Sequence, residues 1–143
     1  MIPKYEEDFY GWSMAMAGLL KERRMTELDY DNLIEEIESM GRSNFDQLTN
    51  RLAVLIAHLL KWQYQSALKG HSWFYTIREQ RAKVKRIVSQ NPSLKSRLDE
   101  AFSYAYKDAI YQAARETGLV DKVFPRQCPY TFEQCLDDEF YPE

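Results

Sequence analysis

The chain has 143 residues, of which 45% are hydrophobic and 29% charged, a size and composition typical of one soluble domain with a substantial core. The mean hydropathy is −0.58, and no apolar run approaches the roughly 18 residues that a membrane span needs. The first residues have neither the basic start nor the apolar stretch of a signal peptide. We therefore expect a cytoplasmic protein without a membrane association.

Charge is distributed unevenly along the chain, although the net charge is only −3. Residues 1–60 carry net −5 and residues 98–143 carry net −6, whereas residues 61–97 contain nine basic side chains and one acidic side chain, net +8. A basic middle between acidic arms indicates helices that attract one another. It also suits a basic face offered to an anionic partner.

Apolar residues recur every three or four positions through the first half of the chain, which predicts helices. The first helix is expected over residues 5–24 and the second over residues 30–40. The core stripe of the second helix should consist of Leu33, Ile34, Ile37 and Met40. Gly41 is expected to end or kink this helix, and Ser43 to cap a third one that reaches about residue 65.

The second half of the chain predicts two further long helices and a tail. Ser72 should cap a helix that ends near residue 90, and Pro92 should open another that ends at Gly118. Alanines at positions 101, 105, 109 and 113 would let a neighbouring helix approach closely. The aromatic tail, residues 119–143, should pack back on the helices, with a short helix opened by a capping box at residues 131–134.

No segment alternates in the manner of a strand, so the predicted fold is all-α. We expect a compact bundle of about five main helices that forms a single domain over residues 1–143. The two cysteines, Cys128 and Cys135, do not have a zinc-binding spacing and are expected to be free thiols. Neither a metal nor another cofactor is predicted.

One cluster of candidate site residues is rich in carboxylates. Glu35 and Glu38 share one face of the second helix and could hold a divalent cation, although a solvated face with a Glu38–Arg42 pair explains them as well. His58 lies on a polar stripe of the third helix, where a hydrogen-bonded structural role is the simpler interpretation.

The fourth predicted helix places Arg81 on its apolar face, whereas Arg78 points elsewhere. A buried guanidinium needs an acceptor because it cannot be neutralised by deprotonation. Glu36, at the edge of the second helix's stripe, is the carboxylate nearest in direction. We therefore predict an Arg81–Glu36 pair, to which His58 or Gln80 adds hydrogen bonds.

Several runs of the sequence resemble the bacterial Domain of Unknown Function 29 family, and together they cover nearly the whole chain. These runs are residues 7–12, 32–43, 58–64, 72–73, 76–81 and 128–131. The resemblance implies a compact helical fold and a bacterial cytoplasm, and it brings no established activity. It places the family signature at Glu35, Glu36, Glu38, Gly41, Arg42, His58, Lys61, Trp62, Trp73, Arg78 and Arg81.

Three functions are compatible with the sequence. The first is a non-enzymatic interaction or regulatory module, whose partner would be an unknown protein or a second copy of the chain. The second is an enzyme or metal-dependent site built around Glu35, Glu38, His58 and Arg81. The third is nucleic-acid binding by the basic segment 61–97, which the low pI of about 5.5 argues against. Its candidate surface consists of Lys61, Trp62, Trp73, Lys83, Lys85 and Arg86.

Overall fold

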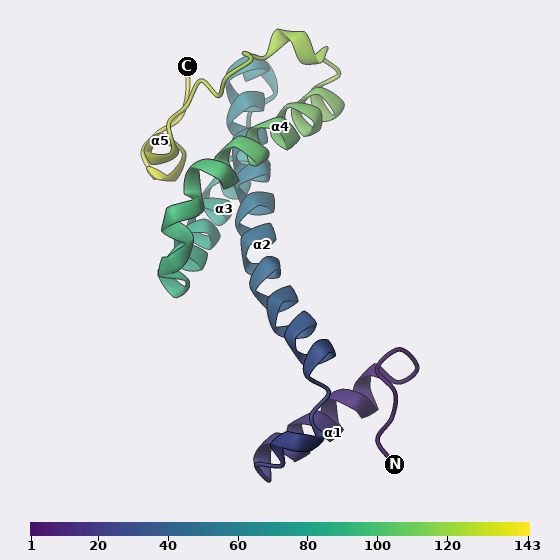
Figure 1. Cartoon of the computed structure of the whole chain (residues 1–143). Coiled ribbons are helices and arrows are strands. Elements are labelled where there is room, and N and C mark those ends of the chain that lie inside the picture. The colour runs from purple at the N-terminus through teal and green to yellow at the C-terminus, as the bar shows by residue number, and fades with distance from the viewer. The chain divides into compact units, whose positions relative to one another are not determined.

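The computed structural model describes all residues from 1 to 143 and contains five α-helices and no strand, which confirms the all-α prediction (Figure 1). The α-helices are α1 (Phe9–Lys21), α2 (Tyr30–Tyr64), α3 (His71–Gln90), α4 (Leu98–Thr117) and α5 (Phe132–Leu136). Short 3-10 turns connect them at Met25–Glu27, Ser66–Leu68, Pro92–Arg97 and Asp121–Val123. No helix combines the length and the apolar character that a membrane crossing requires.

The second and third predicted helices are one continuous helix, α2, so the expectation that Gly41 ends a helix is wrong. A glycine inside a helix costs only about 1 kcal/mol relative to alanine, and no proline accompanies it. α1 is shorter than predicted. The Asp8 side chain caps it by accepting from the Gly11 amide at 2.9 Å, and Arg23 follows its end with a positive φ of 60°.

The chain forms two compact units, Met1–Ser43 and Asn44–Glu143. We call them the N-terminal unit and the C-terminal unit, and α2 contributes its first turns to one and its remainder to the other. The expectation of a single domain stays a prediction.

The N-terminal unit has a small core. Trp12, Met16 and Leu19 of α1 are buried, and Leu33 of α2 packs against them. Three other members of the predicted core stripe are exposed: Ile34 at 52%, Ile37 at 61% and Met40 at 62%. The prediction that these three form core is wrong, because the small core of the N-terminal unit reaches α2 only at Leu33.

The C-terminal unit contains the larger core, which the second part of α2 enters with Leu52, Leu55, Ile56 and Leu59, all fully buried. The predicted alanine stripe of α4 is also fully buried. α4 begins only at Leu98, because the residues after Pro92 form a 3-10 turn, and it ends at Gly118 with a left-handed φ of 78° as expected.

The tail belongs to the core of the C-terminal unit. Phe124, Tyr130 and Cys135 are buried in it, and α5 contacts α3 (Figure 1). The predicted capping box of α5 is present, with the Thr131 side chain accepting from the Gln134 amide and the Gln134 side chain accepting from the Thr131 amide.

Candidate functional site

The glutamates of the carboxylate cluster lie in the N-terminal unit and are bound to neighbours there. Arg42 donates to Glu35 at 3.0 Å and lies 3.9 Å from Glu38, and both glutamates are about 60% exposed. Glu36 accepts a hydrogen bond from the Tyr5 hydroxyl, which raises the pKa of Tyr5 to about 12. These contacts make the cluster an ion-paired, solvated surface.

His58 and Lys61 lie on the buried part of α2, in the C-terminal unit. The Nδ1 atom of His58 is 2.8 Å from the Val54 carbonyl oxygen, and burial lowers the pKa of the imidazole. Lys61 is only 5% exposed, so its predicted place on a basic surface is wrong. Its ammonium group donates to Glu116 at 3.0 Å and lies 4.8 Å from the centre of the Trp73 ring.

Glu116 is the counter-ion that makes the burial of Lys61 tolerable. Burial alone would raise the pKa of Glu116, but hydrogen bonds from Lys61 and Gln112 and the positive charge of Lys61 bring it below its ordinary value. A buried ammonium without such a partner would be costly. Lys61 and Glu116 therefore form a structural ion pair beside the Trp73 ring.

Arg81 is fully buried, as its position on the apolar face of α3 predicted. The predicted pairing with Glu36 is wrong, because the guanidinium donates to backbone carbonyls of the tail. Its Nε atom donates to the Cys135 oxygen at 2.7 Å, and its Nη2 atom donates to the Phe140 oxygen at 2.6 Å. The Tyr141 ring lies 5.1 Å from the guanidinium carbon. Neither His58 nor Gln80 has a hydrogen bond to it, and Arg81 fastens the tail to α3.

The remaining predicted surface residues make different contacts in the C-terminal unit. Trp62 packs against Tyr141 with a centroid distance of 4.9 Å, and Arg78 lies 5.7 Å from the centre of the Phe74 ring. Two lysines are engaged in ion pairs, Lys83 with Glu79 and Lys85 with Asp138. Arg86 is exposed. Trp73 is half-buried, and its ring covers the Lys61 ammonium group. Much of the basic segment's charge therefore serves contacts within the C-terminal unit.

Both cysteines are free thiols, as expected. A hydrogen bond between them lowers the pKa of Cys128 and raises that of Cys135, and burial raises the latter further. No group of three or more histidine, cysteine, aspartate or glutamate side chains is placed to hold a metal ion.

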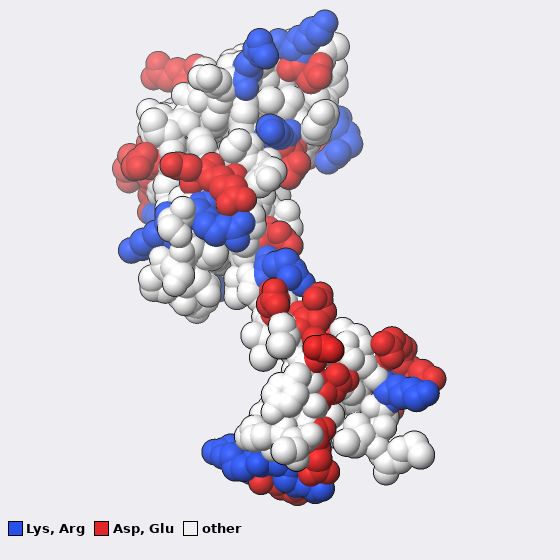
Figure 2. Space-filling view, in the orientation of Figure 1, with Lys and Arg blue, Asp and Glu red and all other residues white.

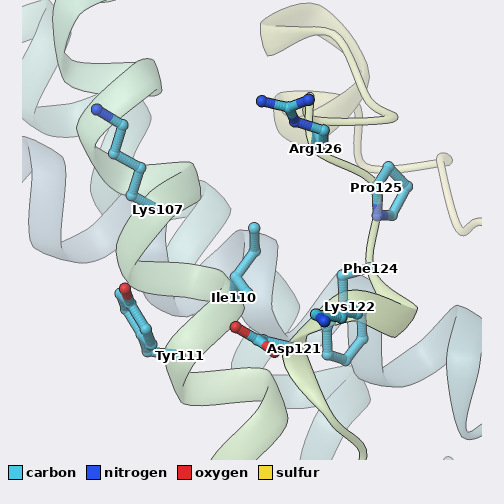
Figure 3. A pocket seen from close by; sticks show the side chains of 8 residues that line it. All are labelled: Lys107, Ile110, Tyr111, Asp121, Lys122, Phe124, Pro125 and Arg126. Atoms are coloured by element: carbon cyan, nitrogen blue, oxygen red, sulfur yellow. The ribbon is translucent and has the colours of Figure 1, made fainter.

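Sequence reasoning missed a cleft of about 340 Å³ in the C-terminal unit (Figure 3). Lys107, Ile110 and Tyr111 of α4 form one wall, and Asp121, Lys122 and the segment 124–126 form the other. The left-handed turn at Gly118 returns the chain beside α4 and so creates this second wall. The sequence carries no local signal for the cleft, because its walls meet only after the turn is formed.

All of the site residues described above lie within the part of the chain that matches one family model. The family model described as "Domain of unknown function DUF29" covers residues 4–141. The chain belongs to the DUF29 family. This membership confirms the resemblance found in the sequence, and it assigns no activity to the DUF29 fold. Neither the curated proteins nor the solved structures contain a match to the chain.

Proposed function

We propose that this DUF29 chain is a non-enzymatic interaction module that binds a basic amphipathic helix of a partner protein. The binding surface is the apolar stripe of α2 in the N-terminal unit, which consists of Tyr30, Ile34, Ile37 and Met40. The observation that carries the proposal is the exposure of the stripe, since each of these side chains is more than half exposed.

The stripe has the spacing of a helix-binding surface. Ile34 and Ile37 follow Tyr30 at four and seven residues, the pattern by which one helix packs along another. Scattered apolar residues on a surface need no explanation, but a contiguous stripe on one helix is typical of an interaction site. The N-terminal unit buries only three hydrophobic residues itself, so it has no further helix with which to cover the stripe.

The charge beside the stripe indicates the chemistry of the partner. On a helical wheel Asp31, Glu35 and Glu38 all fall on the same side of the stripe, with Arg42 as the single basic residue among them. Acidic atoms run along the first part of α2 in Figure 2, next to uncharged surface. A partner helix with apolar residues on one face and lysine or arginine at its edge complements both features. A second copy of the chain would place acidic edge against acidic edge.

A designed peptide provides the test. A fluorescently labelled 14-residue helical peptide with leucines on one face and lysines along the edge of that face should bind the protein. The matched peptide with glutamate in place of lysine should bind at least tenfold more weakly. The double variant Ile34→Asp/Ile37→Asp should lose roughly tenfold or more in affinity, because each isoleucine contributes about 1 kcal/mol when its exposed half is covered. Fluorescence anisotropy measures both effects.

The control is Tyr104→Asp/Tyr111→Asp, which places the same two charges on α4 at tyrosines that are 52% and 67% exposed. This variant should bind the lysine peptide as the unaltered protein does. Equal binding of the two peptides, or of the double variant and the unaltered protein, would contradict the proposal. A dimer in sedimentation experiments that the double variant converts to monomer would instead assign the stripe to a second copy.

A further inference from the structure

The cleft of Figure 3 is more than a single depression. A second hollow of about 280 Å³ adjoins it and shares Lys107 and Arg126 as lining residues, so these two cations stand where the hollows meet. Tyr106, which is 5% exposed, lines the second hollow and donates its hydroxyl proton to the Pro125 carbonyl. This hydrogen bond fastens the rim to α4 and gives the cleft a defined shape.

Three cations line the cleft without a counter-ion. Lys107, Lys122 and Arg126 are exposed, and none of them has a carboxylate oxygen within ion-pair distance, although Asp121 also lies in the wall. In Figure 3 the Lys107 and Arg126 side chains flank one end of the cleft, whereas Asp121 lies at the other end. A concave site lined by unpaired cations raises the local concentration of anions.

The wall behind these charges is apolar. Phe124 is 4% exposed and offers its remaining surface to the cleft, and Ile110 and Pro125 are half-buried beside it. Small-molecule sites have this composition, a mostly apolar concavity in which a few polar groups orient the ligand. A volume of about 340 Å³ is at the lower end of their range and corresponds to roughly ten water molecules.

We propose that this cleft binds a small organic anion whose phosphate or carboxylate group lies between Lys107 and Arg126. The apolar body of the ligand rests on Ile110, Phe124 and Pro125. Asp121 and Lys122 lie together at the far end of the cleft, where their opposite charges favour no second anionic group. Arginine and lysine both suit such a group, the first through its planar fork and the second as a point charge. The site is separate from the stripe on α2 and does not depend on the function proposed for it.

Titration of the ¹⁵N-labelled protein with 1-naphthyl phosphate tests the site. A ligand of this size binds an open cleft with a dissociation constant on the order of 1 mM. Amide resonances of residues 107–111 and 121–127 should shift together along one saturable curve. Neutral 1-naphthol lacks the anionic group and inorganic phosphate lacks the apolar ring, so both should bind at least about fivefold more weakly than 1-naphthyl phosphate. 1-Naphthoate reports whether a carboxylate serves as well as a phosphate.

The variant Lys107→Ala/Arg126→Ala should weaken 1-naphthyl phosphate binding about tenfold and leave 1-naphthol binding unchanged. Its matched control, Arg86→Ala/Lys95→Ala, removes the same charge from exposed side chains outside the cleft and should bind as the unaltered protein does. The spectrum of each variant reports its folding directly. Shifts confined to other residues, or equal affinity of the cleft variant and the control variant, would overturn the proposal.

Discussion

Replacement of Arg81 by alanine should destabilise the C-terminal unit more than any other single change of a charged residue. The guanidinium donates two hydrogen bonds to tail carbonyls at 2.7 and 2.6 Å, each worth about 1.5–3 kcal/mol because the donor is charged. The variant loses both bonds and leaves the Cys135 and Phe140 oxygens without that donor. Removal of a buried charge returns part of this free energy, since its desolvation no longer has to be met.

The expected net loss is about 2–4 kcal/mol, which for a chain of this length lowers the Tm by roughly 5–15 °C. Circular dichroism at 222 nm measures the Tm, and tryptophan fluorescence, to which Trp62 packed on Tyr141 contributes, reports whether the tail leaves α3 first. Arg78→Ala is the control, because Arg78 is exposed on the same helix and its loss should cost less than about 0.5 kcal/mol. An Arg81→Ala variant as stable as this control would refute the assignment of Arg81 as the tail's attachment.

Two further predictions concern the buried groups of α2 and its partner on α4. Burial lowers the pKa of His58, so its contribution to stability is present above about pH 6.5, the unfolded value, and is lost as the pH falls toward the lower folded value. The free energy of unfolding in urea should therefore fall between about pH 7.5 and 5, and the fall should be smaller in His58→Gln. An equal dependence of stability on pH in that variant would contradict the prediction. Glu116→Gln should cost about 1–2 kcal/mol in the same assay, because it leaves the buried Lys61 without a counter-ion, whereas Glu100→Gln, which breaks the exposed pair with Arg97, should cost less than about 0.5 kcal/mol. Equal effects of these two glutamine variants would show that Lys61 does not depend on its partner.

Helical periodicity accounts for what the sequence predicted well. It identified the buried direction of α3 closely enough to place Arg81 inside, and the glycine and capping-box signals located the ends of α4 and α5. A helical wheel gives only a direction around one axis, however. It could not identify the acceptors of Arg81, which lie 54 and 59 residues further along the chain.

The same limit explains the errors on α2. The pattern around Ile37 correctly indicates an amphipathic helix, but periodicity alone does not say whether another helix covers its apolar face. Lys61 was assigned to a surface from its charge, although its methylene chain and the pairing with Glu116 make it a buried residue. The cleft beside α4 depends on the turn at Gly118 and on Tyr106 binding the rim, and neither contact follows from local sequence.

The sequence separation of the Arg81 contacts has a consequence for synthesis on the ribosome. At about 5–20 residues per second, the carbonyls that accept from Arg81 are made roughly 3–12 s after the arginine itself. During that interval the tail is not yet present to cover Arg81 and its apolar neighbours on α3, Ile77 and Val84. The nascent C-terminal unit therefore acquires its final packing late, and a chaperone that shields α3 during elongation would act on this exposed intermediate.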